Sequence, residues 1–267
     1  MNIVIVIQAR CGSTRLPKKI MLPLAGDTVL GHMIERVSRS RYGNGLVIAT
    51  TTNPDDDLIE SFCRYEGVGC FRGHPSDLLD RHYMAGLRYS ADAVVKIPSD
   101  CPLIDPAVID RVIDAYVMNN TALDFVSNLH PASYPDGNDV EVIAMRTLET
   151  AWHEASRPFE REHTTPFIWD NPDRFRLGNV LWERGFDYSM THRWVLDYSE
   201  DYAFISKVYE ELYPGNPCFG MEDILDLVEK RPEIKELNRQ HIGTSWYCDH
   251  LNDLKTLKTA RIETCPM

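Results

Sequence analysis

The chain opens with Asn2-Ile3-Val4-Ile5-Val6-Ile7, which runs directly into Gln8-Ala9-Arg10-Cys11-Gly12-Ser13-Thr14-Arg15-Leu16-Pro17-Lys18-Lys19. The first part is apolar and rich in β-branched residues, and its length suits a buried strand. The second part is a Gly/Ser loop that carries four cations. Such a loop after a buried strand is typical of α/β proteins that bind polyphosphates. We therefore expect an α/β fold with a phosphate site at this loop.

The loop offers both backbone and side-chain groups to an anion. Gly12 lets the backbone approach a phosphate, successive N–H groups can form an anion nest, and Arg10, Arg15 and Lys19 can neutralise its charge. Neither the Walker A spacing nor the G-x-G-x-x-G fingerprint is present. The alternative is a basic loop without a ligand. Cys11 is either a thiol whose pKa is lowered by these cations or a small loop filler.

Signals for strands and helices alternate along the first half of the chain, which predicts a three-layer α/β/α sandwich with a mostly parallel sheet. The second half is less regular. The predicted strands after the first are 45–50, 68–71, 93–97, 140–145, 175–181 and 194–196. The predicted helices are one around 29–37, one opening at Asn53-Pro54, and 76–89, 106–119, 148–154, 160–170, 200–212 and 221–230.

Composition narrows the class of protein. The 28 Lys+Arg against 40 Asp+Glu give a net charge of −12, which argues against binding to nucleic acid or to an anionic membrane. No stretch reaches the ~20 apolar residues that span a bilayer, and no signal peptide is recognisable, so we expect a cytoplasmic protein. Seven cysteines without a C-x-x-C pair indicate free thiols.

Two aspartates are candidate metal ligands. Asp100 follows the strand 93–97 and Asp197 follows 194–196, and ligands of parallel sheets bind beyond the carboxyl ends of strands. Mg²⁺ takes one or two protein carboxylates together with phosphate oxygens. The alternative for each is a turn or a helix start. The run Asp55-Asp56-Asp57 imitates a D-x-D motif, but we assign it to the first turn of a helix.

Further charged residues are candidates for substrate contacts. Asp139 and Glu141 lie one strand step apart and point to the same face, where they are either solvated or turned toward an acceptor or a cation. Arg72 and Arg81 flank a predicted strand–helix junction. They either contact the nucleotide or the acceptor, or are ordinary surface charges of a helix. Arg161, Glu162 and His163 lie together on a predicted helix that we expect to face the same acceptor segment, although a lone histidine is usually structural.

Several motifs together resemble the cytidylyltransferases that make CMP-Kdo and CMP-acylneuraminate, and most closely the spore-coat polysaccharide biosynthesis branch. The resemblance covers about residues 1–212. The matching segments are Ala9-Arg10-x-Gly12-Ser13-x-Arg15-Leu16-Pro17-x-Lys19 with Leu24-Ala25-Gly26, Ser99 to Asp105, Tyr134 to Glu141, Arg161 to Pro166, and Arg193 to Asp201. Tyr198 and Ser199 stand where the family has small residues and proline, which makes the shape of this loop less certain.

The resemblance implies the fold of the nucleotide-diphospho-sugar transferases and a reaction in which CTP and a sugar or sugar acid give a CMP-linked product and pyrophosphate. It implies Mg²⁺ on Asp100 and Asp197. The implied catalytic residues are Arg10, Arg15, Lys19 and Asp100. The implied nucleotide contacts are Ala9, Arg10, Gly12, Ser13, Arg15, Lys19, Arg72 and Asp100. The implied acceptor contacts are Arg81, Asp139, Glu141, Arg161 and His163.

We expect a nucleotidyltransferase domain over 1–212 and a helical extension and tail over 213–267. Within the domain, about 134–187 is expected to select the acceptor and to contribute to a homodimer. The reason is its cluster of aromatics, which need a cover either from a partner subunit or from their own sheet. These aromatics are Trp152, Phe159, Phe167 and Trp169.

Two other functions remain open from the sequence. A GT-A glycosyltransferase uses the same fold on a nucleotide sugar, but it would place a D-x-D after the third strand, where this chain has Ser99-Asp100-Cys101. A non-catalytic nucleotide-binding protein would have no need for both Asp100 and Asp197. Pyrophosphate release from CTP distinguishes the three.

Overall fold

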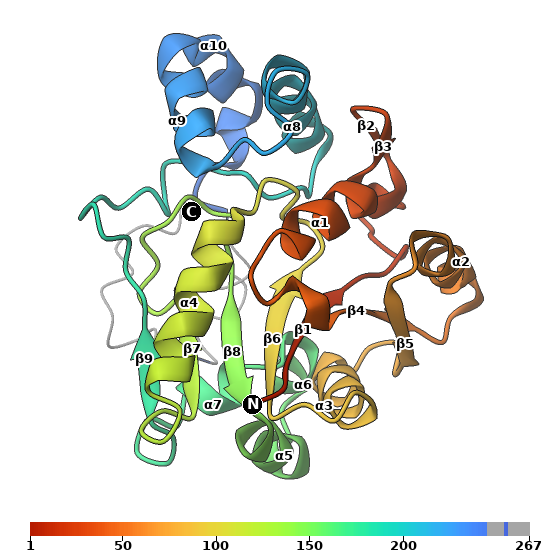
Figure 1. Cartoon of the computed structure of the whole chain (residues 1–267), viewed down its shortest axis with the longest axis vertical. Helices are drawn as coiled ribbons and strands as arrows, with labels where there is room; N and C mark the ends of the chain where they lie inside the picture. Colours follow the sequence, from red (N-terminus) through yellow and green to blue (C-terminus); the bar gives the residue numbers. More distant parts are fainter. Residues whose placement is uncertain (245–253, 256–267) are drawn as a thin grey trace.

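The computed structural model describes residues 1–244 and 254–255. Seven of the described strands form one sheet in the order β5-β4-β1-β6-β8-β7-β9, in which only β8 runs antiparallel to its neighbours. Figure 1 shows this sheet in the middle of the molecule. The sheet strands are β1 (Ile3–Gln8), β4 (Leu46–Thr51), β5 (Gly69–Gly73), β6 (Ala93–Pro98), β7 (Phe125–Ser127), β8 (Glu141–Ala144) and β9 (Leu177–Asn179).

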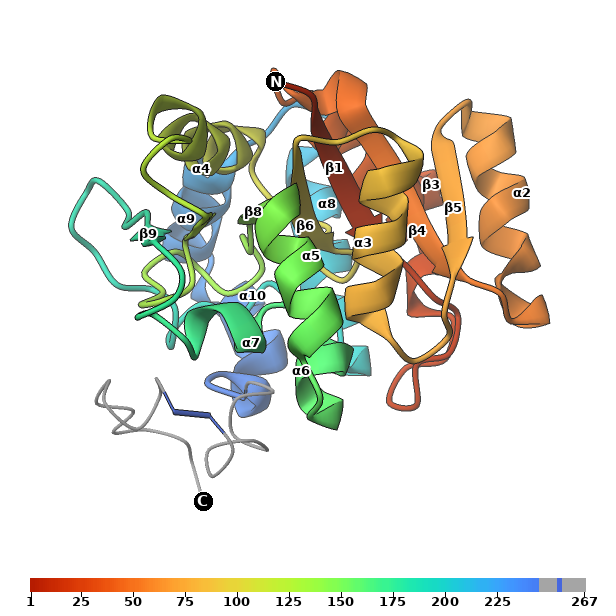
Figure 2. The same cartoon turned by 90° about the horizontal axis from the view of Figure 1, so that it is seen from below.

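Helices cover both faces of the sheet, which confirms the predicted three-layer sandwich. One face is covered by α1 (Val29–Ser38), α2 (Asp57–Glu66) and α4 (Pro106–Met118). The other face is covered by α3 (Leu78–Arg88), α5 (Met145–Glu154), α6 (Pro158–His163) and α7 (Pro166–Trp169). In Figure 2, α3 and α5 lie in front of the sheet, and α3 packs on β6 and α5 on β8.

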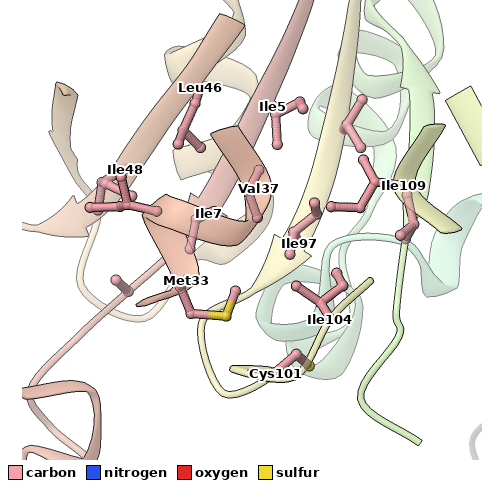
Figure 3. Close-up of a cluster of buried hydrophobic side chains, with 14 of the residues drawn as sticks. Ile5, Ile7, Met33, Val37, Leu46, Ile48, Ile97, Cys101, Ile104 and Ile109 are labelled. Atoms are coloured by element: carbon pink, nitrogen blue, oxygen red, sulfur yellow. The ribbon is translucent and has the colours of Figure 1, made fainter. Parts of the chain in front are cut away.

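The alternation of side chains along β1 explains why two cores form. Ile5 and Ile7 point into the cluster with α1 and α4, whereas Val4 and Val6 point into the cluster with α3 and α5. A strand buried on both faces reads as an unbroken apolar run, which is the pattern that predicted it. Figure 3 shows the first cluster, where Met33 of α1 lies against these isoleucines.

A third cluster joins the C-terminal helices to α1, to α4 and to the loop after β6. It contains α8 (Ser199–Leu212), α9 (Met221–Lys230) and α10 (Pro232–Lys235), which Figure 1 shows together at the top. A 3-10 helix, η4 (Glu236–His241), packs on α8. The predicted boundary at residue 212 falls inside this cluster, since α8 and α9 share it with Leu24 and Leu103. The rest of the predicted tail, 245–253 and 256–267, lies outside the described residues.

The remaining described elements are short. They are the 3-10 helices η1 (Lys19–Met21), η2 (Gly43–Gly45) and η3 (Pro54–Asp56) and the hairpin strands β2 (Pro23–Leu24) and β3 (Asp27–Thr28). The hairpin turns at Ala25 and Gly26, whose φ values of 43° and 92° suit a tight turn of this kind.

Several predicted elements were wrong in detail. The helix over 160–170 is two helices, because Thr164 has a φ of 72° and Pro166 starts α7 without an N–H to donate. Residues 194–196 form no strand, although the adjacent Arg193 makes a single bridge with Asp136. The helix after Asn53 begins as a 3-10 turn, and the Asn53 side chain does not cap it. Strand β7 was missed because it is only three residues long.

The aromatic argument for a homodimer was wrong. Phe159, Phe167 and Trp169 are buried in the cluster between α3, α5 and the sheet of their own chain, and Trp152 packs on its edge. They therefore need no partner subunit to cover them. Among the described residues no helix combines the length and apolar character needed to cross a membrane.

Candidate active site

The predicted site residues meet in a cleft of about 740 Å³ at the carboxyl ends of β1 and β6. Because β8 is antiparallel, its first residue, Glu141, lies at the same edge of the sheet. Of the predicted residues, those that line the cleft are Arg10, Gly12, Ser13, Arg15, Lys19, Arg81, Asp100, Asp139, Glu141, His163 and Asp197. A hollow of about 330 Å³ at the opposite edge, by Asp92 and Arg146, contains none of them.

The loop after β1 is fixed by a buried carboxylate. The N–H of Cys11 donates to Asp56 Oδ1 at 2.7 Å, and the hydroxyl of Thr51 donates to the other oxygen of Asp56. The middle aspartate of the predicted D-x-D imitation is thus a structural anchor. Burial and the neighbouring Asp56 raise the pKa of the Cys11 thiol to about 11, so the alternative of a reactive thiol was wrong and the loop-filler reading holds. Gly12 faces open space in the cleft.

Lys19 connects the two predicted metal ligands. Its Nζ donates to Asp100 Oδ2 at 2.8 Å, to Asp197 Oδ1 at 2.9 Å and to the carbonyl of Leu196 at 2.7 Å. Burial opposes the charge of this lysine, but the two carboxylates outweigh it and raise its pKa. Segments separated by most of the chain, η1, the end of β6 and the start of α8, therefore converge on one ammonium group.

Asp197 also forms an ion pair with an arginine. Arg15 Nη2 lies 2.7 Å from Asp197 Oδ1. Burial alone would raise the pKa of Asp197, but Lys19 and Arg15 lower it to about 2, so this carboxylate is ionised at neutral pH.

A buried arginine positions the backbone around Asp197. Arg193 makes a forked ion pair with Asp201, at 2.9 and 3.0 Å, and Asp201 Oδ2 accepts hydrogen bonds from the N–H groups of Asp197 and Tyr198. The ring of Tyr198 stacks on His241 with centroids 3.9 Å apart. The loop that departs from the family pattern is thus stabilised by contacts of its own.

The far side of the cleft is rich in carboxylates. Burial and the charge of Asp139 raise the pKa of Asp136 well above its usual range, and burial raises the pKa of Asp139 to about 6. Lys96 of β6 donates to Glu141 Oε2 across the strand pair, while Glu141 Oε1 is buried without a hydrogen-bond donor among the described residues.

Three predicted site residues lie outside the cleft. Ala9 is buried under the loop, and its N–H donates to Ala49 in the neighbouring strand. Arg72 donates hydrogen bonds to backbone carbonyls and to the acidic residues in the first turn of α2, so its guanidinium group already has partners away from the cleft. Arg161 pairs with Asp77, the residue that caps α3, and therefore has a structural partner instead of an exposed end in the cleft.

Arg81 lines the cleft near Arg10, and its predicted contact with the acceptor stays a prediction. Its guanidinium donates to the carbonyls of His74 and Pro75, and its charge is close to that of Arg10. Burial and Arg10 lower the pKa of Arg81 to about 10, so it remains charged at neutral pH.

Sequence reasoning did not single out several lining residues, which are Gln8, Lys96, Tyr134, Asp136 and Arg193. A lysine within the buried run Val94-Val95-Lys96-Ile97 was the strongest available signal, because an ammonium group in a buried strand needs a partner.

Similarity to known proteins agrees with this geometry. Residues 4–234 match the sequence profile described as cytidylyltransferase. The chain belongs to the cytidylyltransferase family. As a member, it is a CTP-dependent nucleotidyltransferase. The proposed resemblance to this family is therefore confirmed.

Two relatives and one solved structure span most of this cytidylyltransferase, and a further relative matches less than half of it. It is 34% identical to the uncharacterized protein MJ1063 of Methanocaldococcus jannaschii, over 89% of this chain and 95% of that one. It is 27% identical to the spore coat polysaccharide biosynthesis protein SpsF of Bacillus subtilis, over 87% and 96%. A 3-deoxy-manno-octulosonate cytidylyltransferase of Geobacter sulfurreducens is 37% identical over 42% and 44%. A solved cytidylyltransferase of Leptospira borgpetersenii has a TM-score of 0.83 and 33% identity, over 88% and 96%.

The donor set of the cytidylyltransferase fits a hard divalent cation. Asp100 and Asp197 present oxygens to one point, now approached by the Lys19 ammonium group. Among the described residues no group of three or more His, Cys, Asp or Glu side chains is arranged to hold a metal. Two carboxylates suffice for Mg²⁺, because this ion retains waters and takes further oxygens from substrate phosphates.

Proposed function

We propose that this enzyme transfers CMP from CTP to a sugar-type acceptor and releases pyrophosphate. The observation that carries the proposal is the convergence of Lys19, Asp100 and Asp197 beside the cationic loop of β1. A triphosphate on this loop would bring its α-phosphate to the two carboxylates. The relatives named for 3-deoxy-manno-octulosonate and for spore coat polysaccharide support an acceptor from surface glycan synthesis.

The reaction needs little covalent help from the protein. The acceptor oxygen attacks the α-phosphorus in line and pyrophosphate leaves, so catalysis is positioning and neutralisation of charge. Arg10, Arg15 and Lys19 would hold the β- and γ-phosphates and stabilise the leaving group. Mg²⁺, held by Asp100 and Asp197, would offset negative charge on the phosphate oxygens.

Two further parts of the proposal concern the assembly and the location of the enzyme. A homodimer stays a prediction without its aromatic argument, although the loop after β9 exposes Leu181 and Phe186. A cytoplasmic location also stays a prediction.

Pyrophosphate release tests the function. We expect release from CTP, Mg²⁺ and a panel of sugars and sugar acids, and its loss in Asp100→Asn even at saturating Mg²⁺. Release by Asp100→Asn at the rate of the unchanged enzyme would refute the metal role. Hydrolysis of nucleotide sugars, without pyrophosphate from CTP, would instead support the glycosyltransferase alternative.

A further inference from the structure

The cleft is divided by charge. Arg10, Arg15, Lys19 and Arg81 lie toward β1 and α3, where the triphosphate is proposed to bind. The part of the cleft lined by β8 and the segment before it, the carboxylate side, carries three carboxylates. These are Asp136, Asp139 and Glu141.

The arginine and lysine on the carboxylate side already have anionic partners. Lys96 donates to Glu141 Oε2. Arg193 is held in the fork of Asp201 and lies 3.5 Å from Asp136. A substrate carboxylate would therefore have to compete with a carboxylate of the protein to reach either cation.

By contrast, two carboxylates on this side lack part of the hydrogen-bond donors or cations that they could bind. Glu141 lines the cleft but is only 2% exposed, and its Oε1 is buried without a hydrogen-bond donor from any described residue. Asp139 forms no ion pair within 4 Å among the described residues. A buried carboxylate oxygen without a donor is unfavourable, and a hydrogen-bond donor of a ligand would relieve this cost. The cleft thus presents carboxylate oxygens that can accept hydrogen bonds from the second substrate.

We propose that the acceptor carries a protonated amino group, bound by Glu141 and Asp139, and that this side of the cleft does not select it through a carboxylate. The inference rests on the proposed function, because it takes the triphosphate to occupy the cationic side. Charge complementarity favours an ammonium group here, and a carboxylate placed among these acids meets repulsion.

Binding of matched sugars tests the inference. The enzyme is first loaded with Mg²⁺ and a CTP analogue whose α,β-bridge is carbon, so that no transfer occurs. Affinities are then measured for glucose, for its 2-, 3-, 4- and 6-amino derivatives, and for glucuronic acid. We expect at least one amino sugar to bind about tenfold more tightly than glucose, and glucuronic acid to bind more weakly than glucose. Tighter binding of glucuronic acid, or no preference for any amino sugar, would overturn the inference.

Variants connect the preference to the named residues. Glu141→Gln should reduce the preference for the amino sugar to less than threefold, and, by releasing Lys96, should improve binding of glucuronic acid. Glu66→Gln removes an exposed carboxylate at the end of α2 and should change neither affinity. If Glu141→Gln does not fold, Asp139→Asn serves the same purpose. An unchanged preference in the folded variant contradicts the inference.

The two proposals fail differently in this experiment. Failure of the CTP analogue to bind refutes the proposed function itself. Binding of the analogue without any preference for an amino sugar refutes only the assignment of the acceptor.

Discussion

Replacing Lys19 with methionine tests the convergence at the base of the cleft. The substitution keeps the apolar stem but removes the ammonium group shared by Asp100 and Asp197. Removing one partner of a buried ion pair costs about 3–5 kcal/mol. Asp100 is 27% exposed and Arg15 still pairs with Asp197, so we expect a cost below this range, about 2–3 kcal/mol. That loss corresponds to a decrease in Tm of roughly 4–12 °C for a chain of this size.

Magnesium should partly rescue this variant. In the unchanged protein without CTP, the Lys19 ammonium group occupies the position between the carboxylates, so Mg²⁺ should stabilise it little. In Lys19→Met no ammonium group lies between the two carboxylates, and Mg²⁺ at tenfold its Kd should return about 1.4 kcal/mol.

Thermal unfolding with and without Mg²⁺, in the absence of nucleotide, provides the assay. Lys18→Met is the matched control, because Lys18 is the exposed neighbour and does not line the cleft. The reasoning is refuted if Lys19→Met is as stable as the control, or if Mg²⁺ stabilises the unchanged protein as much as the variant.

Three other substitutions have defined outcomes. Arg15→Ala should weaken CTP binding in calorimetry by about 1.5–3 kcal/mol, whereas Arg72→Ala, which lies outside the cleft, should leave it unchanged. Equal losses in the two variants would show that the nucleotide does not bind where we propose. The pKa of Asp139 is raised to about 6, so its ionisation destabilises the fold as the pH rises from about 4 to 7. In urea unfolding, the free energy of unfolding of Asp139→Asn relative to the unchanged protein should therefore be about 1–3 kcal/mol higher at pH 7 than at pH 4. A difference between the two proteins that does not change with pH would contradict this. Arg193→Met should lower the free energy of unfolding by about 3–5 kcal/mol by leaving Asp201 unpaired, and a loss below 1 kcal/mol would be inconsistent with the observed fork.

Local patterns explain what the sequence predicted well. β1 is an apolar run and β6 is one interrupted only by Lys96, and the residues that follow them, the cationic loop and Asp100, must lie at one edge if the strands are parallel. The helix 221–230 was predicted with its bounds, because its apolar spacing and its proline-flanked end are both local signals.

Contacts between residues that are distant in the sequence explain which site predictions failed. Arg72 and Arg161 have the residue type of a substrate contact, and only the fold shows that Asp57 and Asp77 already hold their guanidinium groups. The place of β8 between β6 and β7 brings Glu141 to Lys96, and no periodicity in the sequence encodes that strand order.

A crystal structure with CTP and Mn²⁺ tests the central claim most directly, because the anomalous signal of manganese locates the metal independently of the nucleotide. We expect the triphosphate along Arg10 to Lys19 and the metal about 2.0–2.3 Å from oxygens of both Asp100 and Asp197, since Mn²⁺ takes oxygen ligands as Mg²⁺ does. A metal held by Asp139 and Glu141, or a triphosphate outside the cleft after β1, would contradict the account.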